Sequence, residues 1–453
     1  MSRDKQELAR SLKERHIMMI ALGGAIGAGI FKGSSSSITM AGPSVVFAYL
    51  LGGIILLFVM QGLAEMAVRN TRAVTFRDLL EPILGRFAGY FAGWIYWITW
   101  VLVMAAEIAA AAVFLSHWFT TVPLWVMALI VSIALTVLNL FQANVFGETE
   151  FWLTGVKIIT LVMFILIGGL LLFTGFGDHP ATGFQHLTDA GGFFPNGLSG
   201  LAQSMLVVML SFGGTEMIGM TLGETQDASV TIPRAARGVI YRVLVFYILP
   251  ILIITALVPW NQLGEDSPFV SVFSAIGIPY VGDIMNFVML TAVLSAANTG
   301  MYATSRMLFT QATDGEAPRY FAKLSKNKVP ARALLASTAF LYISVIIAFF
   351  AKGHTFDYLM VIPGYSIMIT WMLLLVAHLK SRQNVFDAHE YHVKAFPVTT
   401  WIALIALVVI FLAVVATSPV PGTLVALLVM VLVAMSYQLL NPRKSTDARN
   451  SAM

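Results

Sequence analysis

The chain has 453 residues, of which 58% are hydrophobic and only 11% charged, and its mean hydropathy is +0.83. Soluble domains carry about 25% charged residues, so this chain would expose too much apolar surface in water, and lipid must be its solvent. The absence of cysteine excludes disulfides, thiolate metal sites and cysteine nucleophiles. The net charge of +4 does not indicate a nucleic-acid partner, because the placement of the charges matters more than their sum.

Apolar runs of about 17 or more residues are long enough to cross a bilayer as helices. The sequence predicts an all-α integral membrane protein with twelve such spans. They run over Ile17–Met40, Pro43–Val68, Phe87–Leu115, Leu124–Phe141, Phe151–Phe173, Leu198–Leu222, Val239–Val258, Ile284–Phe309, Leu334–Phe350, Tyr358–Leu379, Thr400–Ala416 and Gly422–Leu439.

The basic residues are strongly biased to one side of these spans. With a cytoplasmic N-terminus, all Lys and Arg residues except Lys32, Lys157 and Lys352 fall in segments on the cytoplasmic side. The opposite loop Pro259–Asp283 contains neither Lys nor Arg. Cytoplasmic loops are enriched in these residues, so the pattern predicts that both termini are cytoplasmic and that the number of spans is even.

The first span is weakened by four glycines within residues 23–29. Each glycine destabilises a helix interior by about 1 kcal/mol relative to alanine, so local unwinding is expected. Gly23 and Gly27 also have the spacing of a close-packing surface between membrane helices, which is the alternative interpretation.

The sixth span is interrupted in the same way, by the sequence Ser211–Glu216, which contains two glycines, a threonine and a glutamate. Irregular backbone inside a membrane is tolerated only where it is buried in protein or lines a cavity. Two interrupted helices, each opening a group of five spans, indicate an inverted-repeat transporter with a site near the bilayer midplane. Close packing of helices does not account for both interruptions.

A broken membrane helix offers a ligand two kinds of unpaired backbone group. The start of one half-helix presents free N–H groups and positive dipole, which suit a carboxylate. The end of the other presents free carbonyls, which suit an ammonium. A zwitterion satisfies both sets at once, so the two breaks point to an α-amino acid.

Five motifs in order then resemble the amino acid–polyamine–organocation (APC) superfamily, and within it the bacterial amino acid transporter (amino acid:proton symporter) group. They are GGAIGAGIF at 23–31, FGETEFWLTGVKI at 146–158, SFGGTE at 211–216, IPRAARGVIYRVLVFYI at 232–248 and SAANTGMYATSRMLFTQATDGEAPRYFAKLSKNKVP at 295–330.

The resemblance implies the leucine-transporter fold with a five-plus-five inverted repeat. The first repeat would cover residues 17–173 and the second 198–379. Two further helices would follow over 400–439, with cytoplasmic segments at 1–16 and 440–453.

The resemblance also implies the positions that hold the substrate. The backbone amides of Gly27, Ala28 and Gly29 would bind its carboxylate, and the carbonyls of Ala25, Leu210, Ser211 and Gly213 would bind its ammonium. Relatives often carry Ser or Thr where this chain has Ala28, which removes a hydroxyl but leaves the amides. Gly213 and Gly214 add no side chain to the pocket wall. Apolar surface is expected from Trp100, Val103, Met104 and Leu210, with Tyr365 or Met301 as further candidates.

Four ionisable residues fall within spans, namely Lys32, Glu107, Lys157 and Glu216. In proton-coupled relatives a lysine of span five occupies the region where sodium-coupled members bind their ion. The resemblance therefore implies that Lys157 tethers the span-one break and that the coupling ion is a proton, with no sodium site and no cofactor. From position alone, Lys157 could instead snorkel to the interface.

Glu216 and Glu107 are further candidates for proton coupling. Glu216 could equally cap the second half of span six, and Glu107 could be an internal carboxylate bonded to a neighbouring helix. Glu224 and Arg234 are interpreted as a solvated cytoplasmic face rather than an inner gate. Lys32 could reach the outer vestibule or pair with Glu107, which leaves an acidic substrate open.

The expected function is import of a neutral L-amino acid by proton symport with alternating access, across the bacterial cytoplasmic (inner) membrane. The expected partners are the small-molecule substrate and the lipid bilayer, with no nucleic acid. Exchange of one amino acid for another is an open alternative. A membrane enzyme would need a metal or nucleophile set, and the eight histidines form no HExxH pair. A channel would need a filter motif, and none is present.

Overall fold

Helices form the secondary structure of the residues that the computed structural model describes, apart from one isolated β-bridge between Leu12 and Thr225. These residues are 8, 10–31, 33–141, 143–175, 181–263, 267–275, 280–350, 355–382 and 391–440. Lys32, Lys352, most of the segment 1–9 and the tail 441–453 lie outside them, and so do the expectations placed on those residues. An all-helical arrangement suits a chain in lipid, because each helix satisfies its own backbone hydrogen bonds.

The helices divide into two groups along the chain. The first half contains α1 (Glu14–Ala25), α2 (Ala28–Phe31), α3 (Gly33–Ala41), α4 (Val45–Arg69), α5 (Arg77–Leu84), α6 (Arg86–Ser116), α7 (Leu124–Asn139) and α8 (Ala143–Thr174). The second half contains α9 (Gly197–Phe212), α10 (Ala228–Leu257), α11 (Pro268–Ala275), α12 (Val281–Thr313), α13 (Ala331–Phe350), α14 (Thr355–Ser381), α15 (Val398–Thr417) and α16 (Val420–Leu440). Six 3-10 turns lie between them, of which η3 (Thr215–Met220) and η4 (Leu222–Glu224) follow α9.

Nine helices in the described part of the chain are long and apolar enough to cross a membrane. The predicted run Ile17–Met40 is divided among α1, α2 and α3, and α3 continues into α4 as one apolar stretch, Gly33–Arg69. The predicted run Leu124–Phe141 corresponds to α7, a shorter apolar helix of 16 residues. The all-α membrane class is therefore confirmed, while the number twelve stays a prediction.

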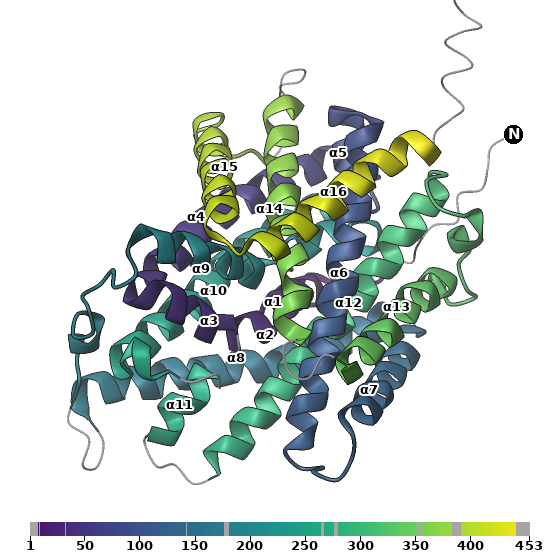
Figure 1. The fold of residues 1–453 in the computed structure, drawn as a ribbon. Helices are drawn as coiled ribbons and strands as arrows, with labels where there is room; N and C mark the ends of the chain where they lie inside the picture. The colour runs from purple at the N-terminus through teal and green to yellow at the C-terminus, as the bar shows by residue number, and fades with distance from the viewer. Residues whose placement is uncertain are drawn as a thin grey trace, which may run out of the picture.

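The long helices differ in how deeply they are buried. The most apolar window of α12 is 78% buried, whereas those of α15 and α16 are 28% and 22% buried. Figure 1 shows α15 at the upper left margin and α16 crossing the front of the molecule toward the upper right, while α1 and α2 lie near the middle. The helix α1 packs against α8, α10 and α12, so the first broken segment is enclosed by other helices.

The short helix α5, which the hydropathy pattern did not predict, is held by the guanidinium of Arg77. This side chain is fully buried, and it pairs with Glu316 at 2.7 Å, with Glu81 at 2.9 Å and with Asp314. Glu81 belongs to α5, whereas Asp314 and Glu316 lie just after α12. Burial raises the pKa of Glu316 above its usual value, although Arg77 opposes this effect. Arg77 therefore fastens α5 to the end of α12.

Candidate functional site

The helix α1 is broken inside the glycine-rich segment. It ends at Ala25, Ile26 leaves the helical region with φ −82° and ψ 78°, and helical structure resumes at Ala28. The amide of Gly27 donates to the carbonyl of Ala25 at 3.0 Å. Of the three amides assigned to a substrate carboxylate, Gly27 is thus already bonded in this conformation. Those of Ala28 and Gly29 lie in the first turn of α2, where backbone amides have no partner within the same helix.

The helix α9 is broken at Gly213 and Gly214. Gly213 is extended, with ψ 144°, and Gly214 has a positive φ of 99°, after which the chain continues as the 3-10 turn η3. A Cβ at Gly214 would lie 2.5 Å from the carbonyl oxygen of Gly24 and 2.8 Å from the amide nitrogen of Ala25. Glycine is needed here both for its conformation and for the contact between the two broken backbones.

Three polar side chains hold the breaks in place. The ammonium of Lys157, on α8, donates to the carbonyls of Gly23 at 2.8 Å and Ile26 at 2.7 Å, and its side chain is fully buried. The hydroxyl of Tyr247, on α10, lies 2.6 Å from the carbonyl of Ala25 and 2.7 Å from that of Ser211, so it bridges the two breaks.

The third of these side chains is Glu216, which is fully buried in η3. Its carboxylate accepts hydrogen bonds from the amide of Gly214 at 3.0 and 3.1 Å, from the Tyr96 hydroxyl at 3.2 Å and from the Trp371 indole at 3.3 Å. All these groups are donors, so the ionised carboxylate is well satisfied. This geometry favours the interpretation that Glu216 caps the break.

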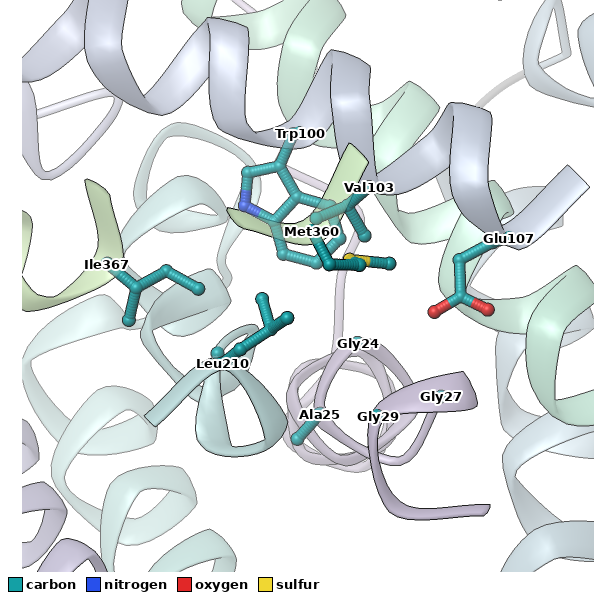
Figure 2. A pocket seen from close by; sticks show the side chains of 11 residues that line it. Gly24, Ala25, Gly27, Gly29, Trp100, Val103, Glu107, Leu210, Met360 and Ile367 are labelled. Carbon is teal, nitrogen blue, oxygen red and sulfur yellow. The ribbon is translucent and has the colours of Figure 1, made fainter. Parts of the chain in front are cut away.

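A cavity lies between the breaks and the helices α6 and α14, as Figure 2 shows. Its volume is about 30 Å³, which is room for about two water molecules. An amino acid would therefore have to displace side chains from it. The described residues that line it are Gly24, Ala25, Gly27, Gly29, Trp100, Val103, Glu107, Leu210, Gly213, Met360 and Ile367.

Most of the residues proposed for the substrate lie at this cavity, but some do not. Ser211, Gly214 and Met104 are not among its described lining residues. Met104 stays a prediction, and in this structure its side chain packs against Gly300 of α12. Trp100, Val103 and Glu107 are spaced by three and four residues and share one face of α6, whereas Met104 lies at the edge of that face.

The two further apolar candidates also lie elsewhere. The hydroxyl of Tyr365 is 2.9 Å from that of Thr423 on α16, and Met301 packs near Asn139 of α7. Sequence reasoning missed Met360 and Ile367, which line the cavity from α14. Their separation of seven residues, or two helical turns, was the available signal.

The carboxylate of Glu107 lies against the first break. A Cβ at Gly27 would be 2.7 Å from its Oε1, and Glu107 is buried. In Figure 2 its side chain points from α6 toward the segment that contains Gly27. A negative charge beside a broken helix end can attract a substrate ammonium or hold a proton.

Several buried charges were not recognised from the sequence. Glu224 is not part of a solvated face: it is buried and bonds Arg306 at 3.1 Å and the hydroxyl of Tyr302. Arg234 is 61% exposed, as expected for a solvated residue. Glu65 is also buried, and it accepts from Arg382 at 2.5 and 2.8 Å. Their partners come from other helices, which spacing along the chain does not show.

Known proteins resemble this chain over nearly its whole length. The profile of the amino acid permease family matches residues 16–441. The amino acid permease YvbW of Bacillus subtilis (strain 168) is 51% identical, covering 96% of this chain and 98% of the relative. The gamma-aminobutyric acid permease of the same organism is 40% identical, covering 90% and 88%. The structure of MhsT in complex with L-phenylalanine matches with a TM-score of 0.64 at 16% identity, covering 90% of this chain and 99% of MhsT.

Proposed function

The chain belongs to the amino acid permease family, and on this premise we propose that it imports a neutral L-amino acid by proton symport with alternating access. Its relatives are named permeases rather than enzymes, and its apolar helices make it a multi-pass membrane transporter. The bias of basic residues supports an inner-membrane location with both termini in the cytoplasm. The MhsT-like fold and the two breaks support twelve spans, with repeats over 17–173 and 198–379 and two further helices over 400–439.

The observation that carries the proposal is the pair of broken helices in backbone contact beside a cavity. The first break offers the amides of Ala28 and Gly29 to a carboxylate. The carbonyls of Ala25, Leu210 and Gly213 lie at the other ends of the breaks, where an ammonium binds favourably. In this conformation Ala25 already accepts from Gly27 and Tyr247, and Leu210 from Gly213, so an ammonium would share or replace these donors. Tyr247 fixes the separation of the two sets, because one hydroxyl lies within hydrogen-bond distance of a carbonyl of each.

The side chains around the cavity support a neutral substrate. Trp100, Val103, Leu210, Met360 and Ile367 supply apolar surface, and Glu107 is the one described lining residue with an ionisable side chain. The carboxylate of Glu107 faces the break rather than a separate pocket for a basic side chain. Met360 and Leu210 have unbranched Cβ atoms, so a change of rotamer in these side chains can enlarge the cavity for a substrate.

A lysine at the first break supports coupling to protons rather than sodium. The ammonium of Lys157 already donates to the carbonyls of Gly23 and Ile26, which are oxygens that a sodium ion would need. When Lys157 loses its proton, it loses the charge that strengthens both hydrogen bonds. The break is then less firmly tied to α8, which couples the proton to the movement of α1.

Transport in proteoliposomes tests this function. The purified chain is given labelled L-phenylalanine, L-leucine, L-alanine, L-glutamate, L-lysine and gamma-aminobutyric acid, with an imposed pH gradient and no sodium. We expect a neutral L-amino acid to accumulate, and dissipating the gradient to stop it. Strict dependence on sodium contradicts the coupling, and selective accumulation of glutamate or lysine contradicts the neutral substrate.

A further inference from the structure

A polar stripe on α8 faces α1. Gly147, Glu150, Thr154 and Lys157 are separated by three, four and three residues, so they share one face of the helix. A Cβ at Gly147 would be 3.1 Å from Nδ1 of His16, near the start of α1. Thr154 donates to the carbonyl of Met19 at 3.2 Å. The stripe thus follows α1 from its first turn to its break.

Glu150 is the member of this stripe that the function proposed above does not use. It is fully buried, and a Cβ at Gly23 would collide with its carboxylate. The carboxylate accepts from Thr154 at 3.2 Å, from Asn298 at 3.0 Å and from the hydroxyl of Ser295. No Lys, Arg or His of the described residues lies within 4.0 Å of it, so its direct hydrogen-bond partners are all neutral side chains.

These partners suit both protonation states of a carboxyl group. The hydroxyls of Ser295 and Thr154 can donate to a carboxylate or accept from a carboxylic acid. Thr154 also has the carbonyl of Met19 as a second acceptor, so its hydrogen can turn away from Glu150. The surrounding bonds therefore do not hold Glu150 in one protonation state.

The stripe leads from the buried lysine to the surface. Glu150 precedes Lys157 by seven residues, which is about 10 Å along the helix. Three residues earlier, Gly147 packs against His16, whose Nε2 lies 2.9 Å from the carboxylate of Glu148. Glu148 is 44% exposed, so protons can exchange with solvent there.

Other charged groups reach this interface from two further helices. Glu107, on α6, acts electrostatically on Lys157 together with Glu150. From α12, Tyr302 stacks on Phe146 at 4.4 Å and belongs to the buried Glu224–Arg306 cluster. The arginines of these elements pair with other carboxylates: Arg15 of α1 pairs with Glu148, and Arg306 of α12 pairs with Glu224.

We propose, on the basis of the proton symport proposed above, that Glu150 accepts the proton that Lys157 releases toward the cytoplasm. One N–H bond of the Lys157 ammonium breaks and an O–H bond forms on the Glu150 carboxylate, which leaves two neutral groups. The proton then passes by way of His16, Glu148 and water to the cytoplasm, and Glu150 becomes a carboxylate again. Water bridges the remaining gaps once α1 moves away from α8.

The test uses Glu150→Gln, which keeps the size and hydrogen bonding of the side chain but cannot hold the proton. Uptake driven by a gradient of about one pH unit is compared with exchange of labelled for unlabelled amino acid at equal pH. One-to-one symport supports about tenfold accumulation under this gradient, because each pH unit is a factor of ten. We expect Glu150→Gln to lose accumulation while its exchange rate stays within about twofold of wild type.

Two further variants serve as controls for this experiment. Glu14→Gln makes the same change at a half-exposed position at the start of α1 and should accumulate as wild type does. Glu150→Asp keeps a titratable group and should accumulate more than Glu150→Gln.

Three results would overturn the role of Glu150. Full accumulation by Glu150→Gln refutes the role of Glu150 but leaves the symport standing. Loss of both exchange and accumulation also refutes that role, because it would make Glu150 a structural residue. A wild-type chain without gradient-driven accumulation refutes the symport itself, and the role of Glu150 with it.

Discussion

Replacement of Gly214 by alanine tests whether the contact between the two breaks forms the binding site. Gly214 has a φ of +99°, which side chains rarely adopt, and its added Cβ would meet backbone atoms of Gly24 and Ala25 at 2.5 and 2.8 Å. Backbone atoms cannot rotate away as a side chain does. The two breaks must therefore separate to accommodate the methyl group.

The size of the effect follows from the cost of the left-handed backbone conformation and the cost of the steric overlap. A left-handed conformation costs a residue with a side chain about 1–2 kcal/mol, and overpacking a buried site costs about 1–3 kcal/mol more. The sum is about 2–5 kcal/mol. Each 1.4 kcal/mol is a factor of ten, so affinity for a substrate that needs both breaks should fall by between about 30-fold and several thousand-fold.

Equilibrium binding of the labelled amino acid to the purified protein measures this loss, and thermal unfolding reports whether the variant is folded. Gly169→Ala is the matched control, because a Cβ at Gly169 meets no atom within 4 Å. Alanine also favours the helix there by about 1 kcal/mol. A folded Gly214→Ala variant that binds within about twofold of wild type would refute the reasoning.

Three further substitutions probe the buried charges. Lys157→Met should abolish accumulation driven by a pH gradient, because it removes the charge that ties the break to α8; retained accumulation in proteoliposomes would remove Lys157 from the coupling. Glu224→Gln should lower the free energy of unfolding by about 3–5 kcal/mol, because it leaves Arg306 without its counter-ion. The double variant Glu224→Gln/Arg306→Met should recover part of this lost free energy. Denaturation midpoints that show no recovery would contradict a stabilising Glu224–Arg306 ion pair. Arg77→Met leaves Glu316 and its neighbouring carboxylates to repel each other, so thermal stability should fall more at about pH 8 than at about pH 5, where protonation relieves them; equal losses would contradict this account.

The breaks could be predicted because their cause is local. Four glycines within 23–29 and two within the segment Ser211–Glu216 weaken the helix whatever surrounds them. Lys157 stood out for a similar reason, since one cation in a long apolar run is visible without a structure. The helical membrane class followed from composition alone.

Other parts of the site depend on partners that come from distant helices. In the sequence, Tyr247 is one aromatic residue among others in an apolar span. That its hydroxyl bridges the two breaks is seen only in the structure, where α10 places it beside both. Glu150 is buried by Ser295 and Asn298 of α12, more than 140 positions away. Spacing along α6 did not distinguish Val103, which lines the cavity, from Met104, which packs against Gly300 of α12, because both lie near the face that carries Trp100.

The central claim is that the two breaks together bind a zwitterion, and binding of paired analogues tests it most directly. The affinity of the transported amino acid is compared with those of its methyl ester, which lacks the carboxylate, and of its deaminated acid, which lacks the ammonium. We predict that each analogue binds at least about 100-fold more weakly, since each leaves one set of backbone groups unpaired. An analogue that binds as tightly as the amino acid itself would contradict the claim.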